Sequence, residues 1–167
     1  MEFVDPVLRL YRTTVRNMLE SSKPSHVPNS SYRHASIILE EMARVAKESF
    51  HAYCGKFSSD VWTPEVTNQL RVAIDRGVDV SIILAGEPES TIPEFLQGRV
   101  RRLDISGVKE GRDGFSRVDH FASVDGRAVR LENNRADRTA LFAANYTELS
   151  EQVEQIFNVL SEFAKAA

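Results

Sequence analysis

The sequence predicts an α/β protein: a mixed β-sheet with a parallel core and an antiparallel hairpin, and helices on both faces. The stretch 78–84 is a nearly continuous apolar and β-branched run, typical of a strand that is covered on both faces. A strand-like run and a helix precede it, which favours a right-handed parallel unit. Asp125-Gly126 stands between two strand-like runs, which indicates a hairpin.

The first 31 residues are expected to lie outside the main domain, which we assign to residues 32–167. Asp5-Pro6 is a capping residue followed by a first-turn proline, and it opens a helix with apolar residues at helical spacing through Leu19. The stretch 21–31 holds two prolines and five serines, which predicts a linker or an ordered surface loop.

Alternating helices and strands are expected in the middle of the chain. Thr63-Pro64 begins a helix that Gly77 ends. The other elements expected here are a helix over 32–48, strands over 51–57, 78–84 and 100–105, and a short helix that begins at Thr91 and ends near residue 98.

The last third of the chain is expected to complete the sheet. Strands over 117–124 and 127–132 flank the hairpin turn, a polar loop occupies 133–138, and a small-residue strand covers 139–144. Residues 148–163 have the apolar periodicity of an amphipathic helix.

Composition and charge restrict the function classes. The 167 residues are 42% hydrophobic and 27% charged, which excludes a disordered or fibrous chain. The net charge of −3 excludes a polycation that binds nucleic acid through bulk charge. One cysteine, no apolar leader and no run near the roughly 20 apolar residues of a membrane span predict a cytoplasmic protein with no membrane contact.

Common cofactor and catalytic motifs are absent from the sequence. It contains no glycine-rich phosphate loop, no G-x-S-x-G element, no H-E-x-x-H pair and no C-x-x-C pair. The four histidines and the cysteine do not have the spacing of zinc ligands. We therefore expect no metal and no cofactor.

Two stretches resemble the phospholipase D-like superfamily. Residues 73–80 read A-I-D-R-G-V-D-V, which is similar to the family's A-x-x-R-G-V-x-V element, and residues 118–127 resemble its catalytic hairpin. Asn145 stands where the asparagine of the family's trailing G-S-x-N element would be, although Phe142 and Ala143 replace the glycine and serine. The resemblance spans roughly residues 35–165 and implies a phospholipase D-like fold with phosphodiesterase or nuclease chemistry. It also implies a homodimer, because single-motif members build one active site from two chains.

The family motif H-x-K-x-x-x-x-D is incomplete in this sequence. With the aspartate at Asp125, Val118 takes the place of the nucleophilic histidine and His120 that of the phosphate-binding lysine. With the histidine at His120, Ala122 takes the place of the lysine and Arg127 that of the aspartate. Neither register keeps all three residues, so the resemblance implies a degenerate single-motif member.

The candidate catalytic residues His120, Asn145 and Asp125 each have a structural alternative. His120 is expected on an otherwise apolar strand face, which favours a hydrogen-bonded core histidine over a catalytic one; that face carries Val118, Ala122 and Val124. Asp125 suits a hairpin turn, and Asn145 suits the cap of the last helix.

Basic residues are concentrated in one region. Residues 99–138 hold ten of them against seven acids. Arg127 and Arg130 are candidate phosphate-binding residues, because arginine binds phosphate bidentately. The alternative is a solvated surface with local ion pairs.

Three functions follow from these observations. The favoured one is a degenerate phospholipase D-like domain that binds a phosphate-containing ligand, nucleic acid or a protein partner without cleaving it. The second is an active dimeric phosphodiesterase or nuclease that uses His120 and Asn145. The third is a protein-interaction module with no phosphate ligand.

Overall fold

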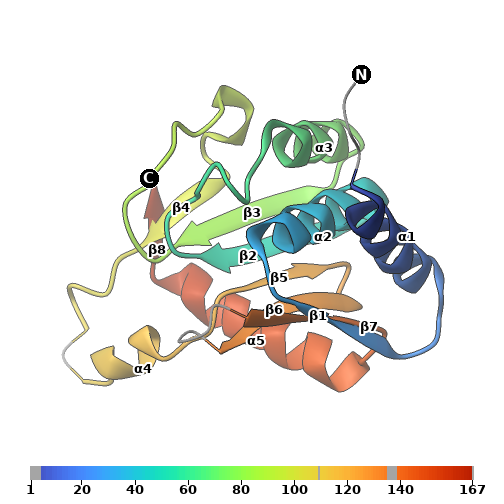
Figure 1. The fold of residues 1–167 in the computed structure, drawn as a ribbon. Coiled ribbons are helices and arrows are strands. Elements are labelled where there is room, and N and C mark those ends of the chain that lie inside the picture. Colours follow the sequence, from blue (N-terminus) through green and yellow to red (C-terminus); the bar gives the residue numbers. More distant parts are fainter. Residues whose placement is uncertain (1–4, 109, 135–138, 167) are drawn as a thin grey trace.

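The computed structural model describes residues 5–108, 110–134 and 139–166. They form one eight-stranded mixed sheet with helices on both faces (Figure 1), which confirms the predicted fold class. In chain order the elements are α1 (Pro6–Glu20), β1 (Ser25–Asn29), α2 (Tyr32–Val45), β2 (Ser49–Cys54), α3 (Pro64–Asp75), β3 (Asp79–Leu84), the 3₁₀ helix η1 (Glu94–Leu96), β4 (Val100–Leu103), α4 (Arg112–Ser116), β5 (Phe121–Val124), β6 (Ala128–Asn134), β7 (Thr139–Ala144), α5 (Thr147–Glu162) and β8 (Ala164–Ala166).

The strands run in the order β1-β7-β6-β5-β2-β3-β4-β8. Strands β2, β3 and β4 are parallel, and β5 lies antiparallel beside β2. The carboxyl ends of β2 and β3 therefore lie at the same edge of the sheet as the start of β5. Ligands of α/β sheets commonly bind at such an edge.

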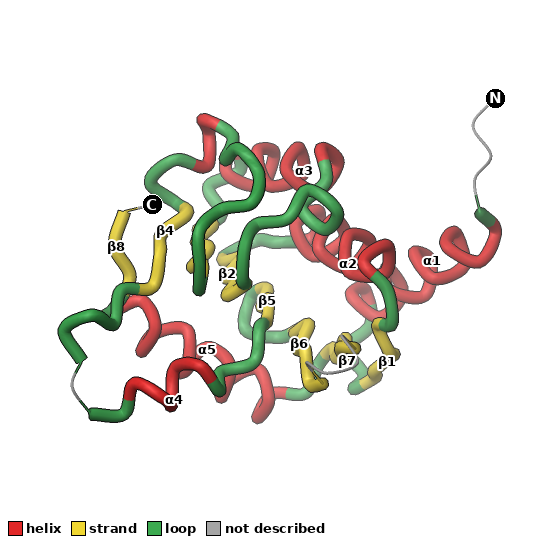
Figure 2. The backbone as a smooth tube through the Cα atoms, turned by 60° about the vertical axis from the view of Figure 1, so that its left-hand side comes forward, coloured by secondary structure: helices red, strands yellow, loops and turns green. Residues whose placement is uncertain are grey.

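The sheet separates two hydrophobic cores. Helices α1, α2 and α3 cover one face and α5 covers the other (Figure 2). Strand β2 contributes to both cores, because successive side chains point to opposite faces. Phe50 and Ala52 belong to the core beneath α2 and α3, whereas Tyr53 belongs to the core beneath α5.

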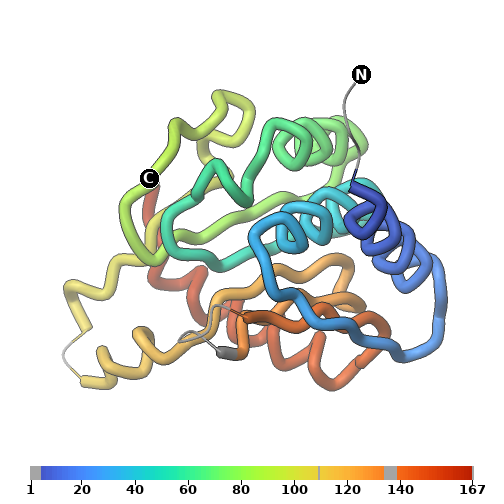
Figure 3. The backbone as a smooth tube through the Cα atoms, viewed as in Figure 1, coloured from blue at the N-terminus to red at the C-terminus, as the bar shows by residue number. Residues whose placement is uncertain are grey.

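The stretch predicted as a linker contains a strand. β1 pairs antiparallel with β7, from Ser25 opposite Ala144 to Asn29 opposite Ala140, and extends the sheet at one edge. The blue segment beside the orange strands in Figure 3 shows this pairing between distant parts of the chain. Pro28 is compatible with a strand here, because an edge strand leaves one row of N–H groups unpaired.

The strand predicted over 117–124 is shorter than expected. It begins at Phe121, and the residues before it include the helix α4, which the sequence pattern did not predict. Val118 lies outside the strand and packs against the α5-side core, whereas Ala122 and Val124 belong to the other core. The expectation that Val118 shares a strand face with Ala122 was therefore wrong.

The predicted hairpin turn is confirmed. Asp125 and Gly126 both have positive φ angles, 53° and 64°, and Val124 pairs with Ala128. The short helix expected from Thr91 is the 3₁₀ helix η1, and the terminal strand β8 was not expected. Of the predicted polar loop, residues 135–138 lie outside the described residues, as does Lys109 of the basic region. None of the described helices is long and apolar enough to cross a membrane.

Candidate functional site

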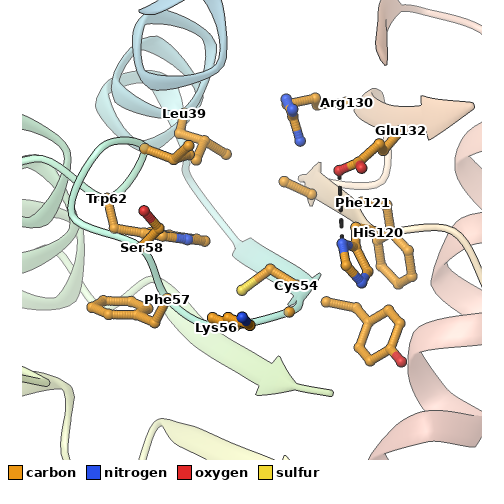
Figure 4. A pocket seen from close by; sticks show the side chains of 14 residues that line it. Leu39, Cys54, Lys56, Phe57, Ser58, Trp62, His120, Phe121, Arg130 and Glu132 are labelled. Atoms are coloured by element: carbon orange, nitrogen blue, oxygen red, sulfur yellow. Dashed lines mark ion pairs between the residues drawn. The ribbon is translucent and has the colours of Figure 1, made fainter. Parts of the chain in front are cut away.

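A pocket of about 160 Å³ opens at the edge of the sheet where β2 ends and β5 begins. Its lining comes from α2, from β2 and the loop that follows it, and from β5 and β6 with the residue before β5. Figure 4 shows two walls: Leu39, Phe57 and Trp62 on one side, and His120, Arg130 and Glu132 on the other. Exposed Lys56 and half-buried Ser58 belong to the loop after β2.

The first wall is apolar and aromatic. Leu39 and Phe57 are each 2% exposed and Trp62 is 7% exposed. The rings of Phe57 and Trp62 are stacked, with centroids 5.0 Å apart. Phe57 has a positive φ of 52°, which a bulky side chain rarely adopts. Such backbone strain is found preferentially at functional sites.

The second wall carries titratable side chains. Nδ1 of His120 lies 3.7 Å from Oε2 of Glu132, and the rings of His120 and Tyr53 are nearly perpendicular, with centroids 5.5 Å apart. The backbone N–H of Glu132 donates to the carbonyl of His120 at 2.9 Å, which fixes the two residues opposite each other. Gly55 leaves the space for the imidazole, because a Cβ there would lie 3.3 Å from Cε1 of His120.

Arg130 is positioned by the strand that the sequence did not predict. Its Nε donates to Oδ1 of Asn29 in β1 at 2.7 Å, and Nδ2 of Asn29 donates to the carbonyl of Ser31 at 2.8 Å. Burial lowers the pKa of the Arg130 guanidinium, and the charge of Glu132 opposes that change. The pocket therefore presents a largely buried guanidinium beside a carboxylate.

Cys54 also lines the pocket. Burial raises the pKa of its thiol to about 12, so the sulfur stays protonated near neutral pH. Since the thiolate is the reactive form, this shift disfavours Cys54 as a nucleophile.

Asp125 lies at the opposite end of the strands. Its carboxylate accepts hydrogen bonds from the backbone N–H groups of Lys47, Glu48 and Ser49 at 2.8–3.1 Å. These bonds hold the segment between α2 and β2 against the hairpin turn. Strand β5 separates Asp125 from His120, a span of roughly 16 Å for five residue steps at about 3.3 Å each.

Asn145 and Arg127 lie at this same far end. Asn145 has a φ of 66°, its Nδ2 donates to the carbonyls of Ser21 and Lys23 at 2.8 and 3.0 Å, and its N–H donates to the carbonyl of Arg127. The guanidinium of Arg127 donates to the carbonyl of Leu19 at the end of α1, at 2.7 Å. Both side chains thus bind the chain that leaves α1.

Two of the five predicted site residues, His120 and Arg130, line the pocket. The other three, Asp125, Arg127 and Asn145, lie at the opposite end of the strands. Lys56, Trp62 and Glu132 were not predicted. A usable signal existed for Glu132, because it stands two residues after Arg130 on β6 and so points to the same side of the sheet. Among the described residues, no group of three or more His, Cys, Asp or Glu side chains is placed to hold a metal ion.

A scan against protein-family models and a search of curated proteins both return no match. Solved structures do match. Nuc from Salmonella typhimurium, a phospholipase D family member, superposes with a TM-score of 0.60 at 16% identity, over 87% of this chain and 99% of Nuc. NucT from Helicobacter pylori gives 0.58 at 14% identity, with the same two coverages.

A further match is TrmBL2, an archaeal chromatin protein that binds DNA. It has a TM-score of 0.59 at 15% identity, and the match covers 96% of this chain and 61% of TrmBL2. These similarities establish that the chain has the phospholipase D-like fold.

Proposed function

We propose that this chain is a degenerate, single-motif phospholipase D-like domain that binds a phosphate-bearing ligand without cleaving it, and that the ligand is a nucleic acid or nucleotide. One observation carries the proposal: Lys56, His120 and Arg130 line a single pocket at the carboxyl end of the parallel strands. Lysine, arginine and protonated histidine are the side chains that bind phosphate oxygens.

The absence of cleavage follows from what surrounds His120. Val118, at the motif's histidine position, packs against the core beneath α5. The thiol of Cys54 is protonated, and the candidate partners Asn145 and Asp125 are hydrogen-bonded at the far end of the sheet. Removing one group that stabilises transition-state charge typically costs about 10²–10³ in rate, and loss of the nucleophile costs more.

Nucleic acid is the favoured ligand class for two reasons. TrmBL2, which shares the fold over 96% of this chain, binds DNA. The pocket also combines cationic groups with aromatic side chains, the combination that single-stranded nucleic acid requires.

The alternative is an active homodimeric phosphodiesterase that uses His120 and Asn145. Part of the α1 surface is available for a second copy: Val15, Met18 and Leu19 are buried within the chain, whereas Val7 and Leu10 are 68% and 67% exposed. We propose a homodimer for either function. Light scattering at micromolar concentration tests it, and a monomer mass would contradict it.

Paired binding and hydrolysis assays test the proposal. Fluorescence anisotropy with labelled single-stranded and double-stranded DNA measures binding over a range of salt, and bis(p-nitrophenyl) phosphate measures hydrolysis with and without a chelator. We expect salt-dependent binding and no turnover. Lys56→Ala is expected to weaken binding roughly tenfold. Lys23→Ala, which removes the same charge at the far end of the sheet, is the matched control and should bind normally.

Two results would overturn the proposal. Turnover that His120→Ala abolishes would establish the dimeric enzyme instead. The absence of both binding and turnover would leave the protein-interaction module.

A further inference from the structure

We propose that the pocket beside His120 receives one pyrimidine ring, so that the ligand is a pyrimidine nucleotide, free or within a single strand. The inference rests on the proposed function and specifies its ligand. It follows from the volume of the pocket, the chemistry of its two walls and the position of Lys56.

The volume admits one ring. The pocket measures about 160 Å³. An engineered apolar cavity of about 150 Å³ in another protein binds benzene, which has the six ring atoms of a pyrimidine. A purine has two fused rings, so part of it would lie outside this volume.

The apolar wall suits the face of a ring. Leu39, Phe57 and Trp62 present carbon surface to the pocket, and the stacking of Phe57 on Trp62 holds the indole in place. Aromatic side chains bind the faces of bases in this way in proteins that recognise single strands.

The polar wall suits the edge of a ring. Arg130 donates hydrogen bonds and Glu132 accepts them, and both side chains line the pocket from neighbouring positions of one strand face. Glu132 offsets part of the charge of Arg130, so this edge of the pocket favours a neutral group and leaves a phosphate to Lys56 and His120. A neutral edge with a carbonyl and an amino or imino N–H matches both side chains, and pyrimidine bases carry such an edge.

The phosphate has a place outside the ring. Lys56 is exposed and belongs to the loop after β2 that forms one side of the pocket, and His120 lies across from that loop. A nucleotide with its base in the pocket would hold its phosphate toward these side chains. In a duplex the bases are stacked and paired, so binding requires a single strand or an extruded nucleotide.

Trp62 gives a direct readout of the ring. It is the single tryptophan of the chain and lines the pocket, so a ring that enters changes its fluorescence. The native protein is titrated with UMP, CMP, AMP, GMP and inorganic phosphate, and then with single-stranded dT12, dA12 and a dT12·dA12 duplex. We expect saturable quenching by UMP or CMP, no quenching by phosphate, and at least tenfold tighter binding of dT12 than of dA12 or the duplex.

Two variants locate the binding. Ser58→Phe places a ring at the mouth of the pocket, and its neighbour Ser59→Phe, which is exposed and does not line the pocket, is the matched control. Glu132→Leu removes the acceptor from the polar wall. Circular dichroism and thermal unfolding check that each variant folds. Ser58→Phe and Glu132→Leu are each expected to weaken UMP and dT12 binding at least tenfold, and Ser59→Phe is expected to bind as the native protein does.

The outcomes separate the two proposals. Equal binding of dT12 and dA12, with unchanged Trp62 fluorescence and no effect of Ser58→Phe, overturns the ring pocket and leaves phosphate binding intact. Quenching by purine and pyrimidine nucleotides alike overturns the size argument. If no nucleotide and no strand binds, both proposals are wrong. Selective binding of free UMP or CMP without binding of dT12 supports the pocket and assigns it to a free nucleotide.

Discussion

Glu41 shows how one buried charge joins two helices. Its side chain on α2 is 1% exposed, and it lies 2.8–3.0 Å from guanidinium nitrogens of Arg12 and Arg16 on α1 and of Arg44 on α2. Burial alone would raise the pKa of this carboxyl, but hydrogen bonds from the three arginines outweigh burial and lower the pKa to about 2. The docking of α1 thus depends on the ionised form of Glu41.

Glu41→Gln is expected to destabilise the protein by about 2–3 kcal/mol near pH 7, because it leaves three partly exposed arginines without their common carboxylate. In the native protein the contribution of Glu41 is present above about pH 4.5 and is lost as the pH falls toward 2, since the folded-state pKa is the lower one. Urea unfolding between pH 7 and pH 2.5 measures both effects. The variant should show the smaller loss of stability on acidification, and exposed Glu20→Gln is the control.

Asp125 is expected to contribute to stability rather than to ligand binding. Its carboxylate accepts three backbone N–H groups, each worth about 1 kcal/mol net, so Asp125→Ala should cost about 2–3 kcal/mol. Asp125→Asn keeps one carbonyl oxygen and tolerates the positive φ, so it should cost about half as much. Urea unfolding measures both costs. Loss of ligand binding by a folded Asp125→Asn protein would instead support a role in the site.

At the scale of elements, local signals account for the elements that were predicted. Asp5 and Thr63 cap the starts of α1 and α3, and Gly77, which has a positive φ, follows the end of α3, as the sequence pattern predicts. Strand β3 was predicted because its apolar run is buried on both faces. These signals lie within a few residues of the element, so the sequence pattern contains them.

Strand β1 was not predicted because its signal lies elsewhere in the chain. Its residues S-H-V-P-N include a proline, and Asn29 alone among them is buried. The strand forms because β7, more than a hundred residues later, supplies its hydrogen-bond partners. The site depends on the same long-range pairing: β1 holds Arg130, and the placement of β5 beside β2 brings His120 to Gly55. The sequence identified His120 and Arg130 as candidate site residues, but it did not show that they line one pocket.

Arg76 couples two helices that both end at the same side of the sheet. It is the C-cap residue of α3, and its Nη2 donates to the carbonyls of Ala43, Arg44 and Ala46 at the end of α2, at 2.8–3.3 Å. These carbonyls have no partner within their own helix. The guanidinium also lies at the negative end of the α2 dipole.

Arg76→Met is expected to lower the free energy of unfolding by about 1–2 kcal/mol, because the alkyl stem remains while the donors are lost. Arg76→Lys keeps the charge and should recover about half of that loss. Arg71→Met, on the same helix but bonded only to Asn68 among the described residues, should be close to neutral. Chemical denaturation of the three variants measures the difference, and equal stability of all three would contradict the coupling of α2 to α3.

At the scale of the whole molecule, α5 covers one face of the sheet, and His51 links the sheet to this helix. Nδ1 of His51 lies 2.8 Å from Oε2 of Glu154 on α5, and Nε2 lies 3.2 Å from Oδ2 of Asp79 on β3. The imidazole also stacks on Phe157, with centroids 4.3 Å apart. Strands β2 and β3 and helix α5 therefore meet at the titratable side chain of His51.

The stability of the molecule is expected to fall as the pH rises above about 6.5, through the loss of the His51 proton. Burial lowers the pKa of His51, but hydrogen bonds to Glu154 and Asp79 outweigh burial, so the pKa in the folded protein lies above 6.5. A group whose pKa rises on folding stabilises the folded protein fully below its unfolded pKa and ceases to do so above its folded pKa.

Burial of His34 lowers its pKa and acts in the opposite direction, so variants rather than the native curve alone isolate the effect of His51. Chemical unfolding at pH 5.5 and pH 8.5 should show that His51→Gln loses less stability across this interval than the native protein does. Exposed His26→Gln is the control and should follow the native protein. An equal loss in the native protein and in His51→Gln would show that the link between the sheet and α5 does not depend on the charge of His51.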